Sequence, residues 1–143
     1  MKTEAKRLNT VIRDVRSSFN LLGDRSNDLL KDLEVNASMR FVLENLSVTG
    51  EKTVPEIARS KNVSRQHIQI VVNDLLDKGL VASRANPSDK RSLLISLTER
   101  GDRIFSEIWN RELVEVQNLA EYFTAEELRV TSKTLQKLSK FLS

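Results

Sequence analysis

The sequence predicts a mainly α-helical fold that carries one small antiparallel β-hairpin. The 143 residues include only 2 prolines and 4 glycines, so few positions interrupt a helix. Apolar residues recur at helical spacing along most of the chain, but between Leu80 and Leu97 the spacing changes to every second residue, as in a strand. This length suits either one domain or one domain with helical extensions.

The first predicted element is a long helix. Its apolar face carries Leu8, Val11, Ile12, Val15, Phe19 and Leu22. Gly23 is expected to interrupt the helix, and the apolar pattern resumes at Leu29. A helix of this length cannot cover its own apolar face, so that face packs either on the rest of the same chain or on a partner.

Two further helices are expected between residues 36 and 61. Asn36 is typical of an N-cap. The helix that follows it places Met39, Val42, Leu43 and Leu46 on one face. After a polar turn at residues 49–52, Thr53 and Glu56 form the pattern of a capping box, which predicts the start of a short helix.

A helix-turn-helix unit and a hairpin are expected next. Asn62 predicts a tight turn, Ser64 caps the second helix of the unit, and Gly79 ends that helix. Two short strands joined by turn-forming residues follow between residues 80 and 97. The second helix of a helix-turn-helix enters the major groove of DNA, and a hairpin behind it is a wing that reaches the DNA backbone or the minor groove.

Two helices are predicted at the C-terminus, the first from Thr98 and the second after a capping-box pattern at Thr124 and Glu127. Their apolar positions include Trp109, Leu113, Val116, Leu135, Leu138 and Leu142. We therefore expect an N-terminal helical segment over residues 1–35, a winged helix-turn-helix lobe over residues 36–99 and C-terminal helices over residues 100–143.

The placement of charge favours DNA as the partner. The formal net charge is +3. Three positive and no negative side chains lie between Ile57 and Asn73, so a polyanion would meet the first half of the second helix, where the helix dipole also favours phosphate. The candidate DNA-binding residues are Arg59, Lys61, Ser64, Arg65, Gln66, His67, Gln69, Ile70, Asn73, Arg84, Lys90 and Arg91.

Several of these side chains have a specific partner in DNA. Glutamine and asparagine amides pair with adenine N6 and N7, and Arg65 reaches a guanine or a phosphate. Ile70 either contacts a thymine methyl group or is one of the single exposed apolar residues that need no explanation. In the hairpin, Asp89 either forms an exposed ion pair of little energetic weight with Arg91 or orients Arg91 toward DNA, and both roles are compatible.

The sequence argues against catalysis and against a membrane location. The chain has no cysteine, and its one histidine, His67, would leave only carboxylates as further metal ligands, so we expect no metal site and no cofactor. It also lacks a Gly-rich phosphate loop, and we expect no enzymatic activity. No apolar run reaches the roughly 18 residues of a membrane span. The N-terminus is charged from Lys2, so we expect a cytoplasmic location.

The sequence resembles the MarR family of winged helix-turn-helix transcriptional regulators. The matching residues are Val35-Asn36, Leu43, Ile57-Ala58, Val63-Ser64-Arg65, Leu75-Leu76-Asp77-Lys78-Gly79-Leu80-Val81 and Arg84. The most specific signal is the wing motif, in which Asp89-Lys90-Arg91 precedes an alternating strand and the segment Leu97-Thr98-Glu99-Arg100-Gly101.

This resemblance implies an obligate homodimer with interleaved N- and C-terminal helices. Its interface would contain Leu8, Val11, Ile12, Val15, Phe19, Trp109, Leu113, Val116, Leu135, Leu138 and Leu142. Two recognition helices would contact the half-sites of a pseudo-palindrome. The resemblance also implies that Ser64, Arg65, Gln66 and Gln69 face DNA, that Arg91 enters the minor groove, and that a small phenolic or lipophilic effector binds between the dimer helices and the DNA-binding lobe.

One alternative to DNA binding stays open at this point. Winged-helix domains also serve as protein-interaction modules that make no sequence-specific contact with DNA. The charge and polarity of the recognition face separate the two functions. This face is basic and rich in amides, which favours DNA.

Overall fold

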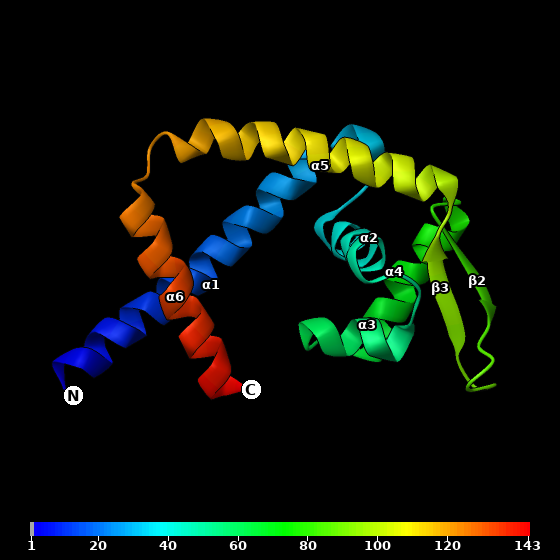
Figure 1. Cartoon of the computed structure of the whole chain (residues 1–143), viewed down its shortest axis with the longest axis horizontal. Coiled ribbons are helices and arrows are strands. Elements are labelled where there is room, and N and C mark those ends of the chain that lie inside the picture. Colours follow the sequence, from blue (N-terminus) through cyan, green and yellow to red (C-terminus); the bar gives the residue numbers. More distant parts are fainter. Residues whose placement is uncertain (1) are drawn as a thin grey trace. The chain divides into compact units, whose positions relative to one another are not determined.

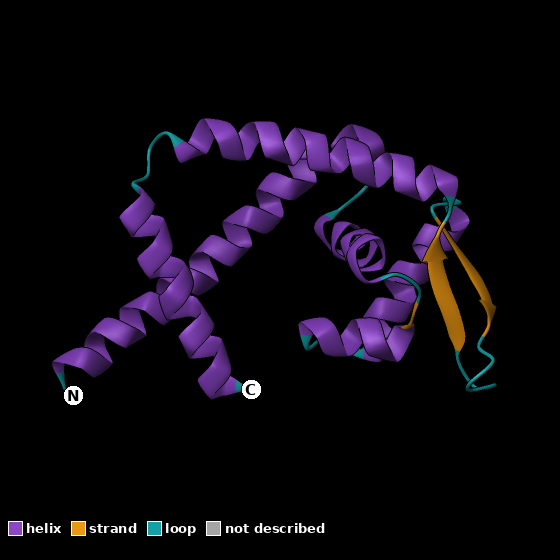
Figure 2. Ribbon diagram, in the orientation of Figure 1, coloured by secondary structure: helices purple, strands orange, loops and turns teal. Residues whose placement is uncertain are grey.

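The computed structural model describes residues 2–143 and is mainly helical, with one small antiparallel sheet, as predicted (Figure 1, Figure 2). The elements are α1 (Thr3–Leu29), the 3₁₀ turn η1 (Lys31–Leu33), α2 (Ala37–Thr49), β1 (Lys52–Thr53), α3 (Val54–Lys61), α4 (Arg65–Asp77), β2 (Val81–Ala85), β3 (Leu93–Leu97), α5 (Glu99–Ala120) and α6 (Ala125–Leu142). Met1, the first residue of the predicted N-terminal segment, lies outside the described residues. The chain divides into two compact units, one that ends at Ile108 and one that spans Trp109–Ser143.

The helix α1 runs without a break through Gly23, so the predicted interruption there is wrong. A glycine inside a helix costs only about 0.5–1 kcal/mol relative to alanine, and the helix formers on both sides of Gly23 offset this cost. The helix ends where Leu30 becomes fully buried. The turn that follows places Glu34 in the left-handed region, with a φ of 58°, and leads the chain into α2.

The core of the first unit is formed by α2, α3 and α4 together with residues of the sheet, the start of α5 and the segment that follows α1. Asn36 caps α2 by accepting a hydrogen bond from the Met39 N–H, and the predicted apolar face of that helix is buried. The capping box at Thr53 and Glu56 is present in both directions. The largest fully buried side chains are Leu30, Val42, Leu43, Ile57, Ile68, Val72, Leu75 and Ile108.

The sheet has three strands in the order β1-β3-β2. The predicted hairpin is formed by β2 and β3, with Val81 opposite Leu97 and Ala85 opposite Leu93. The sequence does not predict the strand β1, because its pattern places Lys52 in a polar turn. It has only two residues and no alternating pattern of its own, and it exists through its pairing with β3.

The end of the hairpin is fastened to the start of α5 by Thr98. Its backbone N–H donates to the Leu80 carbonyl over 3.1 Å, and its hydroxyl donates to the Gly79 carbonyl over 2.7 Å. The same hydroxyl accepts from the Gly101 N–H over 3.0 Å. These bonds hold the hairpin against the lobe that contains α4.

The second unit contains the remainder of α5 and all of α6. Thr124 caps α6 by accepting from the Glu127 N–H over 3.1 Å, which is one of the two bonds of the predicted capping box. None of the described residues of α6 is buried. The exposed large apolar residues of this unit are Trp109, Leu113, Val114, Val116, Leu119, Tyr122, Phe123, Leu128, Val130, Leu135, Phe141 and Leu142.

Candidate nucleic-acid interface

The helix α4 occupies the position of a recognition helix in the helix-turn-helix. Asn62 takes a φ of 55° and reverses the chain after α3, and Ser64 caps α4 by accepting from the His67 N–H over 3.0 Å. The apolar positions Ile68, Val71, Val72 and Leu75 are buried against the core. The opposite face of α4 is therefore fixed toward solvent.

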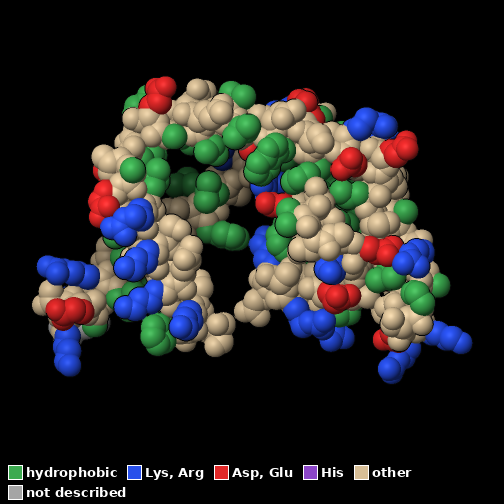
Figure 3. All heavy atoms as spheres, in the orientation of Figure 1, with side chains coloured by type: hydrophobic (Ala, Val, Ile, Leu, Met, Phe, Trp, Pro, Cys, Tyr) green, Lys and Arg blue, Asp and Glu red, His purple; other side chains and the backbone are tan. Residues whose placement is uncertain are grey.

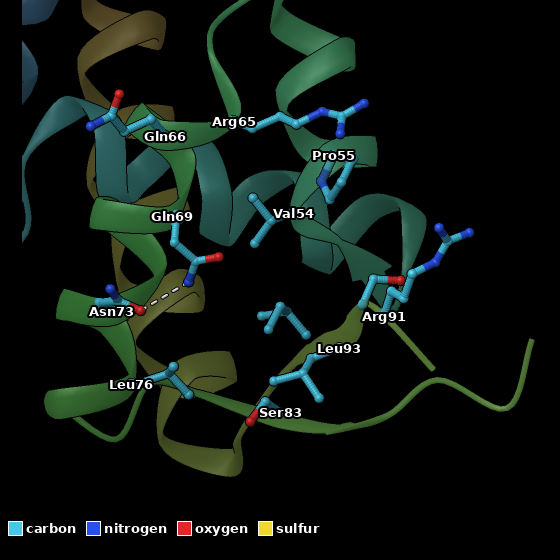
Figure 4. Close-up of a pocket in the computed structure, with 12 residues that line it drawn as sticks. Val54, Pro55, Arg65, Gln66, Gln69, Asn73, Leu76, Ser83, Arg91 and Leu93 are labelled. Carbon is cyan, nitrogen blue, oxygen red and sulfur yellow. Dashed lines mark hydrogen bonds between the residues drawn. The ribbon is translucent and has the colours of Figure 1, made fainter. Parts of the chain in front are cut away.

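This outward face carries the amide and guanidinium groups that the sequence placed there. Arg65, Gln66, Gln69 and Asn73 are exposed, and the side chain of Ile70 among them is 56% exposed. Gln69 Nε2 donates to Asn73 Oδ1 over 2.9 Å (Figure 4). Gln66 points away from the hairpin, whereas Gln69 points toward it (Figure 4).

The wing formed by β2 and β3 ends in a structured tip. Asn86 Oδ1 accepts from the Ser88 N–H over 3.0 Å, and Asp89 Oδ1 accepts from the Arg91 N–H over 2.9 Å. Asp89 also lies 3.6 Å from Arg91 Nε, while the Arg91 side chain stays 93% exposed. Asp89 therefore shapes the tip without covering the Arg91 guanidinium. Figure 3 shows Lys and Arg side chains projecting at this end of the hairpin.

A groove of about 560 Å³ lies between α4 and the wing. Arg65, Gln69 and Asn73 line it from the helix, and Ser83, Arg91 and Leu93 line it from the wing (Figure 4). A second groove continues past Arg65 and Arg91 to Arg59 on α3. The structure thus brings three predicted arginines, which come from three separate elements, to one connected surface.

The carboxylates along these grooves are already engaged. Glu56 accepts from the Thr53 N–H and from its hydroxyl, and these hydrogen bonds lower the pKa of Glu56 below its ordinary value. Asp89 is bonded within the wing tip. The N-terminus of α4 adds the partial positive charge of its dipole beside Arg65. The surface is therefore suited to a polyanion.

Four other predicted residues lie elsewhere. Lys61 Nζ lies 4.6 Å from the Phe41 ring centroid and 5.8 Å from that of Phe19. His67 Nε2 lies 3.4 Å from Ser38 Oγ on α2. Lys90 is exposed at the wing tip and lines neither groove. Direct contact of these three with DNA stays a prediction.

Arg84, the fourth of these residues, is held within the protein. Its Nε and Nη2 atoms donate to the two carboxylate oxygens of Glu51 over 2.8 and 2.7 Å. The hydrogen bond lowers the pKa of Glu51 and raises the pKa of Arg84. Sequence reasoning missed Glu51, because only the pairing of β1 with β3 brings it within reach of Arg84 on β2, the strand on the other side of β3.

Residues 2–143 contain no cluster of three or more His, Asp and Glu side chains placed to bind a metal ion. Within the same range, no helix combines the length and the apolar composition needed to cross a bilayer.

A sequence profile of the MarR family matches residues 41–92, which run from α2 to the wing. An uncharacterised protein of Mycobacterium tuberculosis is 35% identical over 132 residues, covering 90% of this chain and 91% of its own. The transcriptional repressor MdtR of Bacillus subtilis is 26% identical, covering 94% of this chain and 90% of its own.

Solved structures show the same fold. The crystal structure of the MarR family transcription regulator SP03579 aligns with a TM-score of 0.86 at 26% identity, over 97% of this chain and 92% of its own. Reduced AbfR bound to DNA aligns with a TM-score of 0.77 at 21% identity, over 99% of this chain and 100% of its own. The chain belongs to the MarR family of winged helix-turn-helix transcriptional regulators.

Proposed function

We propose that this chain regulates transcription by binding a pseudo-palindromic operator in double-stranded DNA as a homodimer. The observation that carries the proposal is the connected basic surface. It joins the exposed face of α4 to the wing through Arg59, Arg65 and Arg91. DNA affinity derives largely from such phosphate-neutralising contacts, and specificity derives from side chains that reach base edges.

The two parts of this surface would enter different grooves of the duplex. The first half of α4 carries Arg65, Gln66 and Gln69 on its exposed face, and a helix of this size fits the major groove. The wing projects Arg91, which is 93% exposed, and an arginine of this kind is suited to the narrow, negatively charged minor groove. Ser64 would present its capped helix terminus to a phosphate.

A second copy accounts for the apolar surface of the outer helices. Phe19 on α1 is 62% exposed, and Trp109 on α5 is 51% exposed. Leu8, Val15, Leu113, Val116, Leu135 and Leu142 are likewise exposed, and Val11, Ile12 and Leu138 are partly buried. Exposed large apolar side chains in this number are typical of an interface. Two copies related by a dyad would place two α4 helices on half-sites about 34–36 Å apart.

Relatives support this role and add an expected outcome. MdtR is named a transcriptional repressor, and the structural neighbour AbfR has been solved bound to DNA. We therefore expect repression of the regulated promoter. The small-molecule effector implied by the family resemblance stays a prediction.

A salt titration of DNA binding tests the proposal. If about six phosphates are neutralised, a plot of log affinity against log salt concentration has a slope near −5, as measured by filter binding to duplex DNA. A flat slope, or the absence of binding, would contradict the proposal and favour a protein-interaction module.

Two substitutions separate phosphate contacts from base contacts. Arg91→Ala should weaken binding to all duplexes and reduce the salt slope by about 1, whereas Gln66→Ala should change the preference at one or two base pairs. Arg103→Ala is the matched control, because Arg103 is exposed on α5 and lines neither groove. If Arg91→Ala and Gln66→Ala lost the same affinity on every duplex, the assignment of base readout to Gln66 would be wrong.

A further inference from the structure

Three neighbouring side chains occupy the middle of the exposed face of α4. Gln69 and Asn73 lie one turn apart and are joined by a hydrogen bond, and Ile70 lies beside them. All three are exposed, and Ile70 leaves 56% of its surface in water. The core of this helix faces the other way, so burial in this chain does not explain the choice of isoleucine. We call these three residues the amide–isoleucine cluster.

The hydrogen bond fixes how the two amides present themselves. Gln69 Nε2 donates to Asn73 Oδ1 over 2.9 Å, which sets the orientation of both groups. Gln69 Oε1 then remains as a hydrogen-bond acceptor, and Asn73 Nδ2 and the second N–H of Gln69 Nε2 remain as donors. The pair therefore offers the Gln69 Oε1 acceptor beside the Asn73 Nδ2 donor, from adjacent turns of the helix.

Adenine is the purine that uses both an acceptor and a donor of this pair. In the major groove, adenine presents the N7 acceptor beside the N6 donor, whereas guanine presents two acceptors, N7 and O6. Asn73 Nδ2 can donate to adenine N7 while Gln69 Oε1 accepts from adenine N6. Guanine presents no hydrogen-bond donor on this edge, so Gln69 Oε1 would have no partner there, which disfavours that base.

Ile70 supplies the complementary apolar contact. Thymine carries the only methyl group on the major-groove edge of the four bases, and apolar side chains are the groups that read it. Ile70 is the only large apolar residue among the exposed positions of α4. Its position next to Gln69 directs it to the same or the neighbouring base pair.

We propose that the amide–isoleucine cluster reads A·T pairs in each operator half-site, with the Gln69–Asn73 pair on adenine and Ile70 on a thymine methyl group. This inference rests on the proposed function, because it requires α4 to lie in the major groove. The inference assigns the amide–isoleucine cluster to base readout. Arg59, Arg65 and Arg91 then contact the DNA backbone and the minor groove.

The first test removes the thymine methyl group alone. The probe is a duplex recovered by repeated selection from a randomised pool with the full-length chain. Single thymines in it are replaced by deoxyuridine. We expect one position in each half-site to weaken binding about fourfold on loss of one buried methyl group. Ile70→Ala should bind the thymine and deoxyuridine duplexes equally, whereas the control Val48→Ala, at an exposed valine on α2, should keep the difference.

The second test removes the adenine N7 acceptor. Replacing single adenines of the same duplex by 7-deazaadenine should weaken wild-type binding about fivefold at one position in each half-site, the loss expected for one hydrogen bond. Asn73→Ala should abolish that difference while leaving the effect of Arg91→Ala unchanged. Gln69→Ala should also abolish it, since the orientation of Asn73 depends on Gln69.

The outcomes distinguish this inference from the function on which it rests. Salt-dependent binding without any response to deoxyuridine or to 7-deazaadenine would overturn the assignment of the cluster and leave DNA binding intact. A response that persists unchanged in Ile70→Ala and in Asn73→Ala would also overturn it, because other residues would then read those bases. The absence of any DNA binding would overturn both proposals.

Discussion

Gly101 lies where the start of α5 approaches the backbone of Leu80. A Cβ atom at Gly101 would lie 1.9 Å from the Leu80 carbonyl oxygen and 2.9 Å from its carbonyl carbon. These are backbone atoms, and the Leu80 carbonyl also accepts the hydrogen bond from Thr98. We expect Gly101→Ala to lower the free energy of unfolding by about 1–3 kcal/mol, because α5 must shift away from the wing.

Gly23 provides the matched control for this prediction. It lies inside α1, and a Cβ atom there would meet nothing within 4 Å. Gly23→Ala should therefore raise the free energy of unfolding by about 0.5–1 kcal/mol. Urea denaturation at equal protein concentrations measures both variants. If Gly101→Ala were as stable as the wild type, the tight contact between α5 and Leu80 would not exist in solution.

The ion pair between Arg84 and Glu51 gives the wing a dependence on pH. Arg84 lowers the pKa of Glu51 in the folded protein, so the pair contributes stability above the unfolded-state pKa, and this contribution is lost as the pH falls through the folded-state pKa. We expect Arg84→Ala to raise the midpoint of the Glu51 carboxylate titration, as followed by NMR.

Arg84→Lys is the informative second variant for this pair. A lysine keeps the charge but cannot repeat the two-point bond of a guanidinium, so the titration midpoint should fall between those of the wild type and Arg84→Ala. An unchanged midpoint in Arg84→Ala would show that Glu51 and Arg84 are not paired in solution.

The short helix α3 depends on its reciprocal cap. Thr53 accepts from the Glu56 N–H over 3.3 Å, and the Glu56 carboxylate accepts from the Thr53 N–H over 3.1 Å. Thr53→Ala should cost about 1–2 kcal/mol of unfolding free energy. Thr124→Ala removes the one-sided cap of α6 and should cost about 0.5–1 kcal/mol. Thermal or urea unfolding measures both variants. If both lost the same unfolding free energy, the second hydrogen bond of the reciprocal cap would add nothing to the stability of α3.

The helices of the lobe could be predicted from sequence because their signals are local. Asn36 and Ser64 cap the helices that the pattern placed after them, and Thr98 and Gly101 hold the segment that follows the wing. The strand β1 could not be predicted, since its only support is the pairing of Lys52 with Ile95, which lies 43 residues later. The unbroken helix at Gly23 shows that a single glycine is a weak stop signal when its neighbours favour a helix.

For the candidate interface, too, the sequence predicted the local features and missed the contacts between elements. The exposed face of α4 follows from helical periodicity, so Gln66, Gln69 and Asn73 lie where the sequence placed them. The surroundings of Lys61 and Arg84 did not follow, because they depend on side chains from other elements. Phe41 lies under Lys61, and Glu51 holds Arg84. Charge in a sequence therefore marks candidates for DNA contact, and tertiary structure decides how each is engaged.

The proposed dimer would account for the difference in apolar burial between the two compact units. The unit that ends at Ile108 has a buried core, whereas the unit Trp109–Ser143 leaves twelve large apolar side chains exposed, including Trp109 and Leu113. Two helices with so little buried surface gain almost no stability from burial within one chain. A partner that covers them would make folding and association one process, and the unfolding midpoint of the wild type should then rise with protein concentration.

A charge placed on the apolar face of α5 tests this dimer directly. Leu113 is 42% exposed, and in a dimer Leu113→Glu would bury an unpaired carboxylate against apolar side chains. We expect sedimentation velocity at micromolar concentration to show a dimer for the wild type and a monomer for Leu113→Glu. Val48→Glu is the control, because Val48 is 74% exposed on α2 and is not among the residues of the proposed interface, and this variant should stay dimeric.

The same variant links assembly to DNA binding. A monomer engages one half-site and loses the high effective concentration that the first α4 gives to the second, so Leu113→Glu should bind the full operator about 10²-fold or more weakly than the wild type. Its affinity for an isolated half-site should match that of the wild type, since the surface formed by Arg65, Arg91 and the amide–isoleucine cluster lies in the other unit. A Leu113→Glu protein that stayed dimeric, or a monomer that bound the full operator as tightly as the wild type, would show that the outer helices do not set the spacing of the recognition helices.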